Sequence, residues 1–314
     1  LLIESVKIVG LFVDKGEMVV STRGKVESWN KEYRTMANPI ALDLPLVVLT
    51  NGGSASASEI VSGALQDLDR AIIIGERTLG KGLVQTTRSL NYNSQLKVTT
   101  SKYYIPSGRC IQEIDYSHKN DAGVAIKVAD SLISEFKTKN GRIVFDGKGV
   151  LPDIVTQSDK QRVIMYNIIA DYLAFDFATD YYLKHPEIAS ADEFRLSESD
   201  YTSFVDFVAS KNLTYKNPSE KALGNFKAKA EKDDYFDAIE DDYKQMLETI
   251  EEQKRNEILK YKGEISKYLE NEIVSRYYFQ KGRRQASLAR DNEVEEALKV
   301  LSNLDNYNKI LQPN

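Results

Sequence analysis

Cysteine is almost absent from this sequence. The 314 residues include one cysteine, Cys110, and a single thiol cannot form an internal disulfide, so cysteine usage leaves the redox compartment open. No histidine lies near Cys110 in the sequence, although a catalytic thiol needs a base to form its thiolate. We therefore expect Cys110 to be an inert residue rather than a nucleophile.

Histidine is scarce as well. His118 lies in a polar segment and His185 directly precedes Pro186, and these are the two histidines of the chain. We expect both at the surface, which disfavours a catalytic triad that uses histidine as its base. No group of His, Cys, Asp and Glu has the spacing of zinc ligands, so no metal is expected.

Long apolar runs and an excess of positive charge are also missing. No uncharged apolar stretch is long enough for a membrane helix, so no membrane-spanning segment is expected. A net charge of −5 argues against nucleic acid as a partner. The chain starts at Leu1 without an initiator methionine or a basic segment before an apolar one. We therefore expect an interior piece of a longer protein, without a signal peptide.

The composition that is present changes near residue 158. Before this point, short β-branched runs alternate with glycine-containing turns, and after it the apolar residues keep helical spacing. The sequence therefore predicts an α/β domain over residues 1–157 and a mainly helical region over residues 158–314. The helical region is either a bundle packed on the first domain, which we favour, or an arm that grips a partner or substrate. Helices are expected at about 160–184, 199–211, 218–230, 233–280 and 291–302.

The clearest local pattern is a strand, a helix and a second strand. Residues 44–50 and 71–75 are short apolar runs bounded by turn residues, as in buried strands. Between them, residues 56–68 place their apolar side chains on one face of a helix. This order predicts a βαβ unit and a parallel sheet. Further strands are expected at 17–22, 83–88, 95–105 and 142–145.

A serine lies at the junction of the first strand and the helix. Ser56 follows a glycine-containing turn at the carboxyl end of a strand, where α/β proteins often place their chemistry. Such a serine can attack a carbonyl if a base removes its proton, and the N–H of Ala57 can hold the oxyanion. Ser56 and Glu59 also fit a capping box that only closes the helix end. The segment alone leaves both interpretations open.

A lysine between two glycines follows the second strand. Residues 75–81 nearly match a phosphate loop, but Gly82 stands where a magnesium-binding hydroxyl belongs and residues 83–88 alternate as a strand, so no nucleotide is expected. Lys81 can instead serve as a general base when it is uncharged, which an apolar pocket favours. Gln85 can then orient its amine. The alternative is an exposed charge in a glycine turn.

Together the two segments resemble the C-terminal processing peptidases, also called tail-specific proteases. The resemblance covers about residues 1–156 and is strongest over residues 45–112. The matching stretches are GSASASEI at 53–60, GALQD at 63–67, GE at 75–76, TLGKG at 78–82 with Gln85, YYIPSGR at 103–109, IQ at 111–112 and GVLPDI at 149–154.

The resemblance implies a catalytic set. In that family the nucleophile is the middle serine of the cluster, the lysine lies 25 residues downstream, and a glutamine follows the lysine by four; Ser56, Lys81 and Gln85 have this spacing. It implies that Ser56 attacks the peptide carbonyl, Lys81 moves the proton and Gln85 orients Lys81, while the Ala57 N–H holds the oxyanion. It also implies a spiral ββα core of the crotonase and Clp-protease type.

The resemblance further implies a serine endopeptidase that cleaves polypeptides near their C-terminal tails without a metal or nucleotide, in the periplasm or cell envelope, and it leaves room for an adaptor or regulatory protein. The family's upstream PDZ domain and glycine-rich oxyanion turn do not occur in this sequence, so we expect a core truncated at its N-terminal side. Residues 116–148 are expected to be, at least in part, an insertion before the Pro-Asp element. The alternative function is a catalytically silent peptide-binding or scaffold protein on the same fold.

Overall fold

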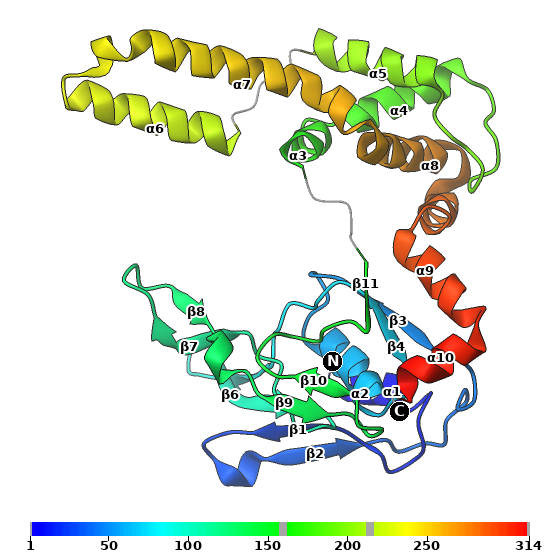
Figure 1. Ribbon diagram of the computed structural model, residues 1–314. Helices are drawn as coiled ribbons and strands as arrows, with labels where there is room; N and C mark the ends of the chain where they lie inside the picture. Colours follow the sequence, from blue (N-terminus) through cyan, green and yellow to red (C-terminus); the bar gives the residue numbers. More distant parts are fainter. Residues whose placement is uncertain (1, 157–161, 212–216, 313–314) are drawn as a thin grey trace. The chain divides into compact units, whose positions relative to one another are not determined.

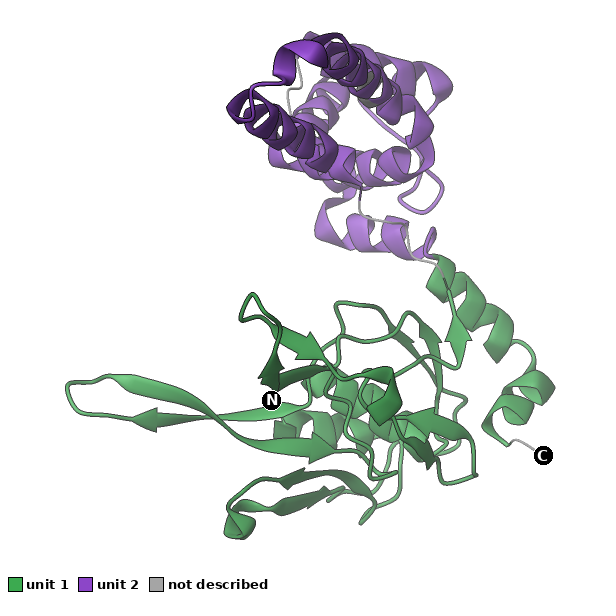
Figure 2. Ribbon diagram, turned by 60° about the vertical axis from the view of Figure 1, so that its left-hand side comes forward, with its two compact units in different colours: residues 1–158, 292–314 green, residues 159–291 purple. Residues whose placement is uncertain are grey.

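The computed structural model describes residues 2–156, 162–211 and 217–312. They form two units, which Figure 2 shows in different colours: the first combines residues 1–158 with residues 292–314, and the second comprises residues 159–291. The predicted boundary near residue 157 lies outside the described residues. The predicted class, an α/β core followed by a mainly helical region, is confirmed.

The first unit contains the predicted βαβ arrangement. Strand β3 (Val47–Thr50) runs parallel to β4 (Ile72–Gly75), and helix α2 (Ala57–Asp67) connects them. Strand β11 (Ile154–Val155) pairs in parallel with the other edge of β4, which gives the order β11-β4-β3. All four residues of β4 are buried, as expected for a central strand covered on both faces.

An antiparallel sheet lies beside this parallel one (Figure 1). Its strand order is β2-β1-β6-β5, so β5 and β6 form a long hairpin that pairs with β1 through β6. The strands predicted near residues 17–22, 83–88 and 95–105 are confirmed. The strand bounds are Met18–Arg23 for β1, Lys31–Arg34 for β2, Leu83–Ser89 for β5 and Gln95–Tyr104 for β6.

The remaining elements of residues 2–156 are short. Helix α1 (Leu2–Val9) packs against α2, and their apolar side chains share one core with Val20, Tyr103 and Ile105. The segment expected as an insertion, residues 116–148, holds most of one small hairpin and all of another. The short elements are η1 (Glu27–Trp29), β7 (Ile114–Lys119), β8 (Ala125–Lys127), η2 (Asp130–Leu132), β9 (Glu135–Lys137) and β10 (Ile143–Phe145).

The last two helices differ from the expected division. Helices α9 (Asn292–Leu301) and α10 (Leu304–Leu311) pack on β3 and β4 and belong to the first unit rather than to a helical region that runs to residue 314. Their apolar side chains bury Ile72 and Ile74 of β4, and a buried β4 needs such a cover. The Leu46 N–H donates to the Tyr307 hydroxyl at 2.9 Å, which fixes α10 at the edge of the sheet.

Among its described residues, the second unit consists of helices joined by loops, with no strand. Residue Tyr172, in a left-handed conformation, divides the helix predicted at 160–184, whose first residues lie outside the described part, and a break at Tyr261 divides the helix predicted at 233–280. Helices α3, α4, α5 and α8 share one apolar core. The bounds are Val163–Ala170 for α3, Leu173–Lys184 for α4, Glu198–Ser210 for α5, Pro218–Lys232 for α6, Phe236–Ala238 for η3, Glu240–Lys260 for α7 and Lys262–Leu288 for α8.

Candidate active site

Ser56 sits in a strained turn between β3 and α2. Its φ of 58° and ψ of −113° lie outside the regions that residues with a Cβ favour. Such strain persists only where the surroundings hold it, and it is concentrated at functional sites. Local hydrogen bonds shape the preceding turn: the Gly53 N–H donates to the Asn51 side chain at 2.9 Å, and the Asn51 N–H donates to the Ser54 hydroxyl at 3.1 Å.

The buried carboxylate of Glu59 joins the serine turn to the lysine loop. Its Oε2 accepts from the backbone N–H of Ser56 at 2.7 Å and from that of Lys81 at 2.9 Å. Its Oε1 accepts from the Gly80 N–H at 2.7 Å and from the Thr78 hydroxyl at 2.6 Å. The side chain is fully buried. A buried carboxylate is tolerated when hydrogen bonds replace its water, so Glu59 holds two distant segments in one arrangement.

Tyr103 of β6 supports the same junction from the other side. Its buried hydroxyl lies 3.1 Å from the Ser56 carbonyl oxygen and 2.5 Å from that of Lys81, and it can donate its proton to either. Burial, assisted by the nearby Glu59 carboxylate, raises the pKa of Tyr103 far above its usual range. The phenol therefore stays protonated and remains a donor at neutral pH.

Glycines let the lysine loop approach its neighbours closely. Gly80 has a φ of +80°, and a Cβ on it would lie 2.6 Å from the Glu113 Cβ. A Cβ on Gly82 would lie 2.9 Å from the Gln112 backbone nitrogen, and the Gly82 N–H donates to the Gln112 side chain at 2.7 Å. The glycines that flank Lys81 are thus required by packing, which fixes where the lysine leaves the backbone.

Lys81 and Gln85 line the same groove, whose volume is about 1180 Å³. Both side chains are exposed, so Lys81 is not in the enclosed apolar pocket that its residue type suggested for a base. Lys102 and Glu113 line the groove as well. Ser56 is half-buried at the serine turn. Within the described part of the chain, no hydrogen bond joins the Ser56 hydroxyl to the Lys81 amine.

Ala57 begins α2, where the first backbone N–H groups have no partner within the helix. Among the described residues, no acceptor binds the Ala57 N–H. The positive end of the helix dipole lies at the same place. This N–H is therefore free to donate to an oxygen that carries negative charge beside Ser56.

Charged neighbours surround Glu113, whose N–H donates to the Gly80 carbonyl at 2.9 Å. Partial burial would raise the pKa of Glu113, but the hydrogen bond from Lys127 and the charge of Arg77 outweigh it and leave the pKa below its usual value. The two cations lie 2.8 Å and 3.0 Å from the carboxylate. Glu113 therefore remains ionised beside the lysine loop.

The other stretches that resemble the peptidases, GALQD, YYIPSGR and GVLPDI, contribute residues to a buried network of ion pairs and hydrogen bonds. Asp153, in the GVLPDI stretch, accepts from Gln66 at 3.0 Å, from Arg142 at 2.6 Å and from the backbone of β4 at 2.8 Å. Arg109 lies 2.9 Å from Asp67, and both side chains are fully buried. Burial, partly opposed by Arg109, raises the pKa of Asp67. These residues hold α2 and β4 together rather than taking part in the site.

Of the scarce residues, Cys110 lines the groove together with Lys81 and Gln85, and neither histidine is among the lining residues. His118 is exposed and lies 2.6 Å from Asp115; hydrogen bonds from Ser117 and His118 hold the pKa of Asp115 well below its usual range. His185 is half-buried and stacks on the ring of Tyr181, whereas we expected it at the surface. Burial raises the pKa of the Cys110 thiol, which disfavours the reactive thiolate.

The joining roles of Glu59 and Tyr103 do not follow from the sequence. Its local pattern predicts only a helix cap for Glu59, and Tyr103 enters only as part of the YYIPSGR stretch. The tandem of glycines around Lys81 was the available signal, because a backbone packed that closely needs acceptors for its N–H groups.

Comparison with known families defines the class. Residues 1–119 match the family model described as peptidase family S41, and residues 164–301 match the one described as probable PDZ-protease, C-terminal helical domain. The chain is therefore a relative of the S41 peptidases, and the resemblance to the C-terminal processing peptidases is confirmed.

Individual relatives agree with this class. A carboxy-terminal-processing protease of Bartonella bacilliformis is 47% identical over 114 residues, which cover 36% of this chain and 26% of the relative. A chloroplastic C-terminal processing peptidase of Tetradesmus obliquus is 41% identical over 112 residues, or 36% of this chain and 24% of the relative. The chain thus spans about a quarter of the length of these relatives.

Solved structures and hydropathy add two findings. The structure of a photosystem II D1 C-terminal processing protease is similar over 50% of this chain and 31% of its own, with 33% identity and a TM-score of 0.34. None of the helices within the described residues combines the length and apolar character that a membrane crossing demands.

Proposed function

We propose that this chain is the catalytic part of a serine endopeptidase that cleaves polypeptides near their C-terminal tails, with Ser56 as nucleophile and Lys81 as base. The observation that carries the proposal is the Glu59 carboxylate, which binds the backbone N–H groups of both residues. A carboxylate in this place brings the serine turn and the lysine loop together without itself reacting. The family relationship supports the reaction class.

The proposed reaction has two steps. The Ser56 hydroxyl oxygen attacks the peptide carbonyl carbon while Lys81 takes the hydroxyl proton, and the Ala57 N–H donates to the oxyanion. Collapse of this intermediate breaks the C–N bond, Lys81 returns the proton to the leaving amine, and an ester remains on Ser56. Water then attacks the ester carbonyl carbon while Lys81 takes its proton; the bond from that carbon to the Ser56 oxygen breaks, Lys81 returns the proton to this oxygen, and the acyl product leaves with a new carboxyl terminus. Gln85 orients the Lys81 amine.

The geometry requires one adjustment before this chemistry. The Ser56 hydroxyl and the Lys81 amine must come within hydrogen-bond distance, and catalytic hydrogen bonds often tighten only when substrate binds. A polypeptide in the groove would also cover the exposed Lys81 side chain. We propose that the whole protein is exported to the periplasm or cell envelope, acts without a metal or nucleotide, and is open to regulation by an adaptor.

Substitution tests the nucleophile. Ser56→Ala should lower cleavage of a denatured protein substrate by at least about 10³-fold while leaving thermal unfolding unchanged. Ser54→Ala, in the same turn, is the matched control and should retain cleavage. Full turnover by Ser56→Ala would refute the assignment.

A covalent probe separates the proposal from its alternative, a catalytically silent peptide-binding or scaffold protein. Intact-mass spectrometry after treatment with a peptide boronate or chloromethyl ketone, with unfolded substrate present, should place an adduct on Ser56 that Lys81→Ala abolishes. The exposed Lys81 is the observation that favours the alternative. The absence of an adduct under every activating condition would support that alternative.

A further inference from the structure

Helix α6 and the first half of α7 form an arm without a core of its own. Within the second unit, Figure 1 shows this arm reaching away from α4, α5 and α8. Glu220 and Ala230 are the buried side chains of α6, and none is fully buried from Glu240 to Gln253. Since helix propensity alone stabilises helices of this length only marginally, the arm is expected to bury an apolar face against another surface.

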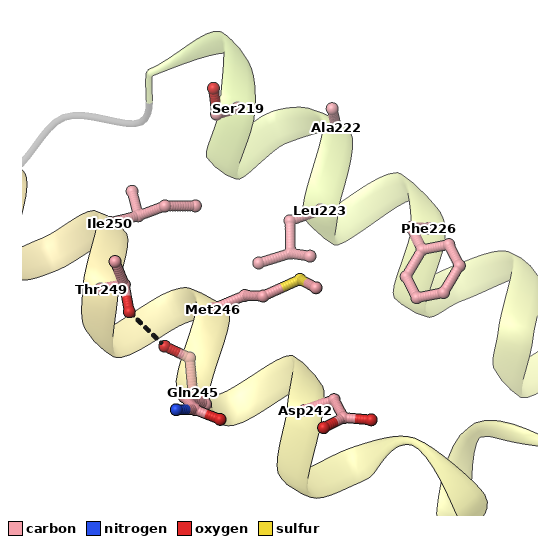
Figure 3. A pocket seen from close by; sticks show the side chains of 9 residues that line it. All are labelled: Ser219, Ala222, Leu223, Phe226, Asp242, Gln245, Met246, Thr249 and Ile250. Atoms are coloured by element: carbon pink, nitrogen blue, oxygen red, sulfur yellow. Dashed lines mark hydrogen bonds between the residues drawn. The ribbon is translucent and has the colours of Figure 1, made fainter.

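The arm presents such a face as an open groove between its two helices. The groove has a volume of about 770 Å³. Figure 3 shows Leu223 of α6 and Met246 of α7 facing one another across it. Phe226 and Met246 are 43% and 56% exposed, which is high for large apolar side chains at the centre of a helix pair. The lining residues are Ser219, Ala222, Leu223, Phe226, Asp242, Gln245, Met246, Thr249 and Ile250.

The spacing of the lining residues is that of a helical seam. Along each helix they recur at intervals of three and four residues, the pattern by which helices pack side by side in coiled coils and four-helix bundles. Two helices with parallel seams that open to the same side provide half of a four-helix bundle. The fitting occupant is a second pair of helices.

Charge identifies which pair of helices fits. Helix α6 carries four lysines and two glutamates, whereas residues 240–252 of α7 carry six acidic residues and one lysine. The charges also lie beside the groove, because Lys229 is three residues after Phe226, and Glu248 is three residues after Gln245. One side of the groove is therefore basic and the other acidic.

We propose that this groove is the docking surface for the same arm of a second copy of the chain. A two-fold axis through the groove places α6 of each copy against α7 of the other, so that basic helices meet acidic ones on both sides. Phe226, Met246 and Ile250 of the two copies then form a shared apolar core. A polypeptide without this division of charge would match one side of the groove and oppose the other.

The first test measures the association state of the full chain by sedimentation velocity across a concentration series. The wild type should form a dimer that dissociates on dilution. Met246→Glu should weaken the dimer by at least about tenfold, with an unchanged far-ultraviolet spectrum. Leu259→Glu, which alters an exposed leucine of the same helix outside the groove, is the matched control and should leave the dimer intact.

A charge exchange tests the pairing without altering the groove itself. The variant Lys229→Glu/Lys232→Glu and the variant Glu248→Lys/Glu252→Lys should each be monomeric, because like charges then meet on both sides of the two-fold axis. Mixing the two variants should restore a heterodimer. A monomeric wild type at every concentration, or a dimer that persists in Met246→Glu, would overturn the proposal. So would a monomer whose binding of denatured polypeptide is lost in Met246→Glu, since that result assigns the groove to substrate.

Discussion

Glu59 is the residue that connects the two segments of the candidate site, because its carboxylate accepts hydrogen bonds from both. It lies in the first turn of α2, where a carboxylate is favoured by the helix dipole, yet three of its four hydrogen-bond donors come from the loop at residues 78–81. The fourth is the N–H of the strained Ser56. One side chain therefore maintains both the strain and the separation of the two backbone segments.

Replacement of this carboxylate should be costly. Glu59→Gln places an amide NH₂ among N–H donors, leaves at least one buried donor without an acceptor and should lower the free energy of unfolding by about 3 kcal/mol. Urea denaturation would measure this. Glu4→Gln, which breaks an exposed pair with Lys7, is the control and should cost less than about 0.5 kcal/mol. Equal effects of the two substitutions would contradict the role assigned to Glu59.

At the scale of elements, the glycines around Lys81 show how a loop is held against a sheet. Gly80→Ala should lower the free energy of unfolding because the new Cβ meets Glu113 and the backbone φ is positive. Gly16→Ala introduces the same kind of φ strain, at +95°, with no atom within 4 Å of the new Cβ. Thermal or urea unfolding should show Gly80→Ala to be less stable than Gly16→Ala by about 1 to 3 kcal/mol. If the two variants lose the same stability, close packing at Gly80 plays no part.

The βαβ unit could be predicted because its signals are local. Apolar runs of strand length flank a helix with one apolar face, and the turn residues lie between them, so β3, α2 and β4 follow from residues 44–75 alone. The candidate serine and lysine were identified by spacing and by resemblance. Their proximity in space depends on contacts between segments about 20 residues apart.

Other features could not be predicted because they depend on tertiary partners. The sequence of α9 predicts an amphipathic helix but does not indicate which sheet the helix covers. Its packing on β3 and β4 was therefore not predicted. The choice between a buried and an exposed Lys81 was left open for the same reason, since a residue type cannot reveal which side of a loop faces a groove. The break at Tyr172 has neither proline nor glycine beside it, and at Tyr261 the nearby glycine, Gly263, lies inside α8 rather than at the break.

At the scale of the whole molecule, the C-terminal helices are part of the first unit's core. Leu311→Ala removes a side chain that is 8% exposed and packs with the cluster on β4, and it should lower the free energy of unfolding of this unit by about 2 kcal/mol. Leu304→Ala, in the same helix but 51% exposed, should have little effect. Hydrogen exchange would locate the loss: protection should fall in β3 and β4 and be unchanged in α4 and α8. A loss confined to the second unit would contradict this packing.

The path of the chain gives the second unit two covalent connections to the first, one after residue 158 and one before residue 292. A single backbone cut within residues 162–211 or 217–291 would therefore detach no domain. Helices α9 and α10 would remain bound through their apolar contacts and the hydrogen bond from Leu46 to Tyr307. The cut molecule would migrate as one species in a native gel and as two in a denaturing gel. A proposed peptidase can cleave other copies of itself. With this topology, a single cut in the helical unit would leave both fragments bound to the first unit.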